Sequence, residues 1–396
     1  MRAGNPALRH PLLTALALSL GAAISLGISR FSYALLLPPM RADLGWSYLL
    51  AGAMNTANAF GYFIGALVTP AVMRRFGAQA ALNGGALLTA IFMLLSGFVT
   101  DADMLLLQRV LAGIASAFIF ISGGVLAARL GALHPGRAGF LIGLYYGGTG
   151  FGISLSALLV PATIEAAAAY AAPHAWQWAW LALGCVCLLM MALMALPAAR
   201  IDGSTPAGGN HGGFRVRPFA FGLAGYFMFG VGYIGYMTFV IALLKEQGMP
   251  AQTVTAFYAA LGLAVVTSSR IWARMLDHFK GGQALAILNA LLAAATLLPV
   301  LTAATPAVFV SGILFGAVFL SVVASTTALV RHNLPAHAWS AGISGFTTVF
   351  AFGQIAGPTV VGWISDQAGG LQRGLVFSAA ALLLGALLAS RQRALQ

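Results

Sequence analysis

Residues 12–38 read LLTALALSLGAAISLGISRFSYALLLP and contain a single charged side chain, that of Arg30. A helix needs roughly 20 apolar residues to cross the hydrocarbon core of a bilayer, and this run exceeds that length. Similar runs continue to Ser390, so that 60% of the 396 residues are hydrophobic and only 7% are Asp, Glu, Lys or Arg. Because water cannot solvate so much apolar surface, the sequence predicts an integral membrane protein with many spans.

Twelve such runs predict twelve membrane-spanning helices. They are 12–38, 48–73, 78–99, 104–128, 138–160, 176–196, 218–244, 251–273, 283–301, 306–330, 338–364 and 371–390. Backbone groups inside a bilayer must be hydrogen-bonded within the segment, which favours helices. The runs also lack the alternation of apolar and polar residues that is typical of a β-barrel. The expected fold class is therefore an all-α membrane protein.

The basic residues are distributed unevenly over the loops. If the N-terminus is cytoplasmic, fifteen Lys and Arg residues fall on inside loops, against Arg41, Lys245 and Arg373 on outside loops. Basic residues accumulate on cytoplasmic loops, so we expect both termini in the cytoplasm and a multi-pass protein of a bacterial inner membrane. The net charge of +12 is spread over short loops, which indicates no nucleic-acid partner.

The longest polar interruption, 197–217, is rich in Gly, Ser and Pro and is typical of a flexible linker. It divides the twelve spans into six and six. We therefore expect an N-terminal six-helix bundle at 1–196, a cytoplasmic linker at 197–217 and a C-terminal six-helix bundle at 218–396. Two repeated halves are the layout of many secondary transporters.

Several motifs carry a resemblance of almost the whole chain to the major facilitator superfamily. They are the six-plus-six layout, Gly65-x-Leu67 leading to Arg74-Arg75-x-Gly77, Arg109-x-x-x-Gly113, the glycine-rich span from Gly139 to Gly152, and Gly353-Gln354-x-x-Gly357-Pro358. More narrowly, Ser29-Arg30-Phe31 followed by Leu36-Leu37-Pro38-x-Met40 resembles the bacterial YbfB/YjiJ-like branch. The resemblance implies two pseudo-symmetric bundles that work by alternating access.

A set of loop and span residues is expected to serve close packing, gating or movement of the halves. These are Gly65, Arg74, Arg75, Gly77, Gly113, Gly143, Gly147, Arg270, Arg274, Asp277, Gly353, Gly357 and Pro358. The small-x-x-x-small pairs in the fifth and eleventh spans let helices approach closely, and we expect them at contacts between the halves. The superfamily's usual Asp is absent near Thr69, which leaves Asp277, with Arg270 and Arg274 nearby, to form a gating salt bridge.

Two basic residues, Arg30 and Arg109, lie within spans. A charge at mid-bilayer costs roughly 2.5–3.5 kcal/mol even on the lenient insertion scale. If the first span ends at Pro38, both lie roughly 10 Å below the outer ends of their helices. The resemblance places these spans beside a central cavity, where two guanidiniums would suit a carboxylate. Alternatively, Arg109 serves helix packing, and Arg30 snorkels or hydrogen-bonds backbone carbonyls.

Other polar or aromatic residues could line a passage beside the arginines. The candidates are Asn55, Asn58, Tyr62, Tyr145, Tyr226, Tyr233, Tyr236 and Gln354. The two asparagines share a helix face with Tyr62, but Asn in a span is also typical of hydrogen bonding between helices. The three tyrosines of the seventh span form a stripe that suits either packing or a gate.

The spans carry no acid or histidine well inside them, since all seven His fall in loops or at span ends. A buried carboxylate or imidazole is the usual proton carrier, so a proton relay would need boundary groups such as Asp43 or Glu165. Two arginines also repel a cation. The sequence therefore predicts a secondary carrier of a small organic anion, a carboxylate, that works by alternating access. The alternative is a proton-coupled exporter of amphipathic compounds or drugs.

Other classes of protein lack support in the sequence. There is no phosphate-binding Gly-x-x-x-x-Gly-Lys loop, no metal-ligand cluster, and no nucleophile or carboxylate pair in the spans. We therefore expect no enzyme, no catalytic residue, no metal and no cofactor. A channel would differ from a carrier by continuous conduction. The expected partners are an anionic small molecule, the lipid bilayer and protons as a candidate coupling ion, and the expected state is a monomer.

Overall fold

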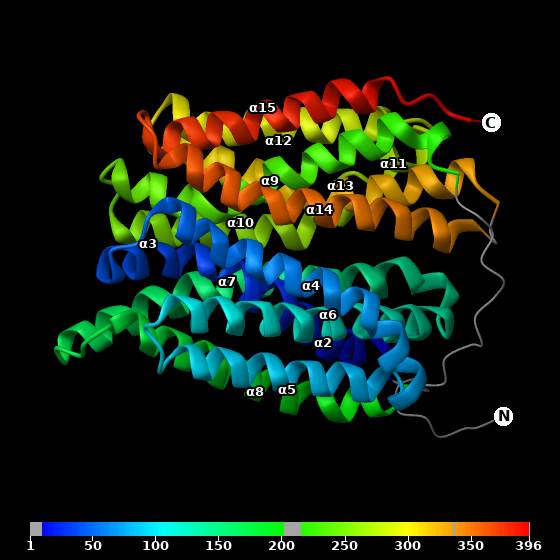
Figure 1. Ribbon diagram of the computed structural model, residues 1–396. Helices are drawn as coiled ribbons and strands as arrows, with labels where there is room; N and C mark the ends of the chain where they lie inside the picture. Colours follow the sequence, from blue (N-terminus) through cyan, green and yellow to red (C-terminus); the bar gives the residue numbers. More distant parts are fainter. Residues whose placement is uncertain (1–9, 202–214, 336–337, 396) are drawn as a thin grey trace. The chain divides into compact units, whose positions relative to one another are not determined.

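The structure is a computed structural model that describes residues 10–201, 215–335 and 338–395. In these ranges long helices follow one another through short connections (Figure 1). Eleven of the described helices are long and apolar enough to cross a membrane. A further long helix, α14 (Trp339–Ser365), covers the expected eleventh span and carries Gly, Ser and Thr along its length. The prediction of an all-α membrane protein is confirmed.

The chain forms two compact units. The first comprises Met1–Leu44 and Ala57–Pro206, and the second comprises Gly45–Thr56 and Ala207–Gln396. The linker expected at 197–217 overlaps the end of a helix at Ala199, and its residues 202–214 lie outside the described residues. The grouping of residues 45–56 with the second unit was not expected from the sequence.

The first unit is built on a few close helix contacts. Its elements are α2 (Pro11–Ala22), η1 (Ala23–Phe31), α3 (Tyr33–Leu44), the later turns of α4 (Tyr48–Phe76), α5 (Ala78–Ser96), α6 (Ala102–Ala132), η2 (Pro135–Arg137), α7 (Ala138–Ala169) and α8 (Ala175–Ala199). α5 packs against α6 and α8, and α7 packs against α2 and η1. A Cβ at Gly27 would lie 2.6 Å from the Thr149 carbonyl oxygen, so only glycine permits this approach of η1 to α7.

The first span changes helix type along its length. α2 passes without interruption into η1, a π-helix, and α3 follows after Ser32. The expected end of this span at Pro38 is wrong, because α3 continues through Pro38 and Pro39 to Leu44. Proline keeps a helical φ and removes one backbone donor, which a packed helix can tolerate. Arg30 therefore lies roughly 20 Å, rather than 10 Å, from the C-terminal end of this span.

The second unit surrounds one central helix. Its elements are the first turns of α4, η3 (Arg217–Phe219), α9 (Ala220–Glu246), α10 (Ala251–Ile271), α11 (Ala273–His278), α12 (Gln283–Leu301), α13 (Thr305–Asn333), α14 and α15 (Gly370–Ser390). α9 packs against α14 and α15 and is buried along almost its whole length. α12 packs against α13 and α15, and α10 packs against α13.

The start of α4 is held by a carboxylate at the end of α14. Asp366 Oδ1 accepts a hydrogen bond from the Tyr48 amide at 2.7 Å, and Oδ2 accepts one from the Leu49 amide at 2.8 Å. The Tyr48 hydroxyl donates to Glu246 Oε1 at the end of α9. The first amides of a helix lack partners within the helix. Asp366 supplies them, which explains why these turns group with the second unit.

Asp366→Asn is expected to lower the free energy of unfolding by about 1 kcal/mol. The amide offers one oxygen to two backbone N–H groups and loses the charge that the helix N-terminus favours. The thermal midpoint of the purified protein in detergent measures this effect. Asp103→Asn is the matched control, since Asp103 is exposed in the first turn of α6. Equal midpoints for the two variants would contradict the capping role.

Gly77, expected from the loop motif, joins α4 to α5 with a φ of +86°. Residues with a Cβ rarely adopt this conformation, so Gly77→Ala should lower the free energy of unfolding by about 1 kcal/mol. Gly84→Ala is the control, because Gly84 lies inside α5 with open space around its Cβ position. That control should raise stability by about 0.5–1 kcal/mol. Thermal midpoints that shift in the same direction would contradict the backbone argument.

Candidate functional site

Arg30 lies in η1 and is only 3% exposed. Its Nε and Nη2 atoms are buried without a hydrogen-bond partner. These two nitrogens form one edge of the guanidinium, an edge that can donate two parallel hydrogen bonds to a carboxylate. The guanidinium carbon lies over the Tyr62 ring of α4, 5.9 Å from its centre. Arg30 therefore offers an unused pair of donors at membrane depth.

Arg109, on α6, is buried to the same extent but has defined partners. Its Nη1 donates to the Ser29 carbonyl oxygen at 2.7 Å. Its guanidinium carbon lies 5.2 Å from the centre of the Tyr33 ring and 5.7 Å from that of Trp180. Two aromatic faces and a carbonyl fix the orientation of a guanidinium. Since Ser29 directly precedes Arg30, Arg109 holds the backbone that carries Arg30.

The surroundings of η1 combine positive charge with unsatisfied donors. The charge of Arg30 acts unfavourably on Arg109. The ion-pair contacts found within residues 10–201, 215–335 and 338–395 do not include Arg30. The hydroxyls of Ser29 and Ser32 are also buried without a partner. Buried donors and cations without partners are costly, and an anion would satisfy both.

Two further candidates of the first unit make contacts between helices. Asn58 Nδ2 donates to the Arg109 carbonyl oxygen at 3.3 Å, and the Tyr145 hydroxyl donates to the Phe120 carbonyl oxygen at 2.8 Å. Both residues are buried. The structure thus brings Arg30, Arg109, Asn58 and Tyr62 together, with the asparagine joining α4 to α6.

The second unit holds the remaining candidates, Asn55, Tyr226, Tyr233, Tyr236 and Gln354. The Tyr233 hydroxyl donates to Gln354 Oε1 at 2.7 Å, and the Tyr236 hydroxyl lies 2.6 Å from Ser311 Oγ. Asn55 Nδ2 donates to Thr238 Oγ1 at 2.8 Å. All five candidates are buried. These side chains join helices of one unit. For the tyrosine stripe, this favours packing over a gate.

Four of the glycines expected to serve movement lie at close helix contacts within one unit. A Cβ at Gly65 would lie 2.5 Å from the Ile114 carbonyl oxygen, and one at Gly113 would overlap the Asn58 carbonyl. Gly353 and Gly357 pack against α9, and Gly143 and Gly147 lie on α7, the latter buried. We expected the two small-residue pairs at contacts between the halves. Close packing inside one bundle accounts for the pair on α14.

The remaining motif residues lie near helix ends or inside α14. Arg74 and Arg75 are exposed at the end of α4, and Arg270 is exposed at the end of α10. Arg274 and Asp277 are exposed on the short helix α11. Pro358 lies inside α14, where its carbonyl faces Gly52 at the start of α4. Thr69 hydrogen-bonds to the Gly65 carbonyl of its own helix at 2.7 Å.

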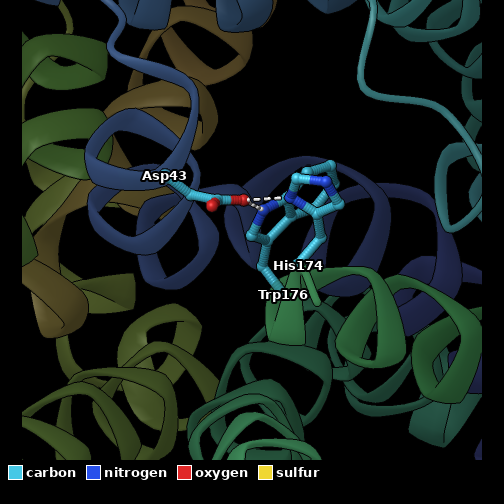
Figure 2. A network of polar contacts seen from close by, with 3 residues as sticks. All are labelled: Asp43, His174 and Trp176. Carbon is cyan, nitrogen blue, oxygen red and sulfur yellow. Dashed lines mark hydrogen bonds and ion pairs between the residues drawn. The ribbon is translucent and has the colours of Figure 1, made fainter. Parts of the chain in front are cut away.

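A polar network that the sequence did not predict joins the end of the first span to the start of α8. Figure 2 shows that the Asp43 carboxylate meets both His174 and Trp176. Asp43 Oδ2 accepts from Trp176 Nε1 at 2.5 Å and lies 2.6 Å from His174 Nδ1. Asp43 and His174 are about one-third exposed. This boundary acid, a candidate for proton transfer, is therefore paired at the C-terminal end of the first span.

Two units of long apolar helices define a multi-pass membrane protein, and the family that matches the chain makes it a transporter. The model of the family described as "Uncharacterised MFS-type transporter YbfB" matches residues 22–390. The chain belongs to this family of the major facilitator superfamily, which confirms the resemblance seen in its motifs.

Relatives of known name agree with this assignment. A protein of Agrobacterium vitis named "Putative tartrate transporter" is 30% identical over 151 residues, so the match spans 37% of this chain and only 33% of that relative. A bacterial homologue of the human lysosomal transporter Spinster has a TM-score of 0.74 at 16% identity, with 98% of both chains covered. The nucleoside transporter NupG has a TM-score of 0.69 at 15% identity, covering 98% of this chain and 99% of its own. At these identities the two structures show a shared fold.

Proposed function

We propose that the protein is a secondary carrier that moves a small organic anion, a carboxylate, by alternating access, and that Arg30 binds the carboxylate. The observation that carries this proposal is the buried edge formed by Nε and Nη2 of Arg30, which has no partner. A carboxylate would accept two parallel hydrogen bonds from that edge and neutralise its charge. The tartrate named for the Agrobacterium vitis relative is itself a carboxylate anion.

The other residues of the site have supporting roles in this proposal. Arg109 is a positioning residue, because it is hydrogen-bonded to Ser29 and enclosed by two aromatic rings. Its charge adds to the attraction of an anion from a distance. Tyr62 lies beside the Arg30 guanidinium, whose Nε and Nη2 edge would meet the anion.

The alternative of a proton-coupled exporter has less support. The tyrosine stripe on α9 would be the aromatic wall of such an exporter, but two of its hydroxyls are engaged with Gln354 and Ser311 and the rings are buried. We further propose that the protein acts as a monomer in the bacterial inner membrane with both termini in the cytoplasm. The excess of basic residues on alternate loops supports that orientation.

Counterflow in proteoliposomes tests the proposed function. Vesicles preloaded with unlabelled succinate, tartrate or phenylacetate should accumulate the same labelled anion faster than unloaded vesicles or vesicles without protein. Labelled tetraphenylphosphonium, a lipophilic cation, should show no such acceleration. Counterflow of the cation without counterflow of any carboxylate would overturn the proposal in favour of an exporter of cationic amphipathic compounds.

A further inference from the structure

Four aromatic side chains form a connected group beside Arg30 in the first unit. The group consists of Tyr62 on α4, Phe120 on α6, and Tyr145 and Tyr146 on α7. The ring centres of Phe120 lie 6.5 Å from Tyr62, 6.1 Å from Tyr145 and 5.4 Å from Tyr146. The ring centres of the two α7 tyrosines lie 5.0 Å apart. A continuous aromatic surface thus leads away from the Arg30 guanidinium, which contacts its first ring.

Neighbouring glycines provide the space for the two tyrosines of this group. A Cβ at Gly123 would lie 2.5 Å from the Tyr145 hydroxyl oxygen, and one at Gly124 would lie 3.1 Å from that of Tyr146. The Tyr145 hydroxyl is fixed by its hydrogen bond to the Phe120 carbonyl. A pair of glycines on α6 therefore receives a pair of tyrosines on α7, and the rings are held in place.

Three rings of the group are only partly buried, and they lie on other sides of their helices than the large exposed apolar side chains do. Tyr146 is 37% exposed, while Tyr62 and Phe120 are half-buried. On α7 the large exposed apolar side chains Phe151 and Leu158 share one face, and Tyr146 lies about 120–140° around the helix from them. Tyr62 lies about 160° around the helix from the exposed Phe60 on α4.

Phe120 follows the same pattern on α6, where it lies about 140° from the exposed Leu107. The group differs from the aromatic cluster of the second unit. There, Tyr226, Phe229 and Tyr233 are buried and stack on one another. Rings that contact one another, are partly accessible and lie away from the exposed apolar side chains of their helices are suited to contact a ligand rather than only to fill a core.

We infer that the first unit contains an aromatic subsite beside Arg30, and that the transported anion is a carboxylate that bears an aromatic ring. This inference rests on the proposed function, because Arg30 holds the carboxylate while Phe120 and Tyr146 contact the ring. A small aliphatic acid would leave the exposed parts of these two rings uncovered. The subsite therefore favours aryl-substituted acids over aliphatic acids of the same chain length.

Equilibrium binding of matched pairs of labelled acids to the purified full-length protein tests the inference. The pairs are phenylacetate with acetate, and 3-phenylpropanoate with propanoate. Burial of a phenyl ring should make each aryl acid bind at least about tenfold more tightly than its partner. Phe120→Leu and, separately, Tyr146→Leu should reduce that ratio to about threefold or less. Phe151→Leu, which removes an exposed ring from a different side of α7, should leave the ratio unchanged.

The outcomes separate this inference from the proposed function. Aryl and aliphatic acids that bind equally, no binding of either aryl acid, or a ratio unchanged in both Leu variants would overturn the aromatic subsite. After any of these outcomes, the proposed function would still stand if Arg30→Gln lost the binding of every acid that the wild type binds. Conversely, an Arg30→Gln protein that still binds every acid as the wild type does would overturn the proposed function itself.

Discussion

Arg30→Gln is expected to abolish carboxylate transport while the protein remains folded. Glutamine carries no charge and cannot present two parallel N–H groups, so the loss should correspond to about 2–5 kcal/mol, or at least about 30-fold in transport at low substrate concentration. The variant also removes a buried cationic edge that has no partner in the protein. Its thermal midpoint without substrate should therefore equal or exceed that of the wild type.

Two further variants sharpen this test. Arg30→Lys keeps the charge but loses the planar fork, so its transport should lie between the wild type and Arg30→Gln. Arg391→Gln removes an exposed arginine beyond the last helix and should transport at the wild-type rate. Uptake into proteoliposomes and a melting curve in detergent give both readouts. Full uptake by Arg30→Gln, or a midpoint lowered by many degrees, would contradict the role assigned to Arg30.

Arg109→Gln should have the opposite effect on stability. Arg109 donates to the Ser29 carbonyl and lies between Tyr33 and Trp180, so its removal breaks a charged hydrogen bond and two cation–π contacts. The expected decrease in the free energy of unfolding is about 2–4 kcal/mol. Melting curves of the two glutamine variants compare two equally buried arginines directly. Equal midpoints for the two variants would contradict the claim that Arg109 stabilises the fold whereas Arg30 does not.

The positioning role of Arg109 has its own readout. Arg109→Lys can still donate to the Ser29 carbonyl but loses the planar stacking on the aromatic rings. We expect this variant to fold at the assay temperature. Because the backbone before Arg30 is then held less firmly, the half-saturation concentration for the carboxylate should rise several-fold. The maximal rate should change less. If Arg109→Lys lowers only the amount of folded protein and leaves the half-saturation concentration unchanged, Arg109 serves packing alone.

The helices were predictable because the signal for a membrane span is strong and local. Runs of roughly 20 apolar residues are diagnostic by themselves. The end of the first span was not predictable, since Pro38 breaks helices in most contexts but is accommodated here within α3. The π-helix at Ala23–Phe31 also leaves no pattern in the residue types, because it is set by the packing of the first span on its neighbours.

The candidate site was predictable only in part. An isolated arginine in an apolar run is visible in sequence, so Arg30 and Arg109 stood out. Their difference in partners depends on Ser29, Tyr33 and Trp180, which the fold brings to Arg109 from other helices or other turns. From the sequence alone, aromatic residues in a span are most simply interpreted as packing residues. Which rings are partly exposed is decided by helix rotation, which a sequence of almost uniformly apolar helices does not reveal.

Contacts between segments that are distant in the sequence were the least predictable. Tyr48 at the start of α4 and Asp366 are 318 positions apart in the sequence, and they meet only in the folded chain. Asp43 and His174 are likewise brought together by the fold. Each is an ordinary loop-side residue in the sequence. Asp366 and Asp43 acquire their roles only in the fold, where Asp366 caps the start of α4 and Asp43 binds His174 at the start of α8.

Equilibrium binding of a labelled carboxylate to purified wild-type protein and to Arg30→Gln tests the central claim most directly. The probe is whichever of succinate, tartrate and phenylacetate gives the strongest counterflow. We predict saturable binding to the wild type and binding at least about 30-fold weaker to a variant that melts at or above the wild-type temperature. Equal affinity of the two proteins for that anion would contradict the assignment of Arg30 as its ligand.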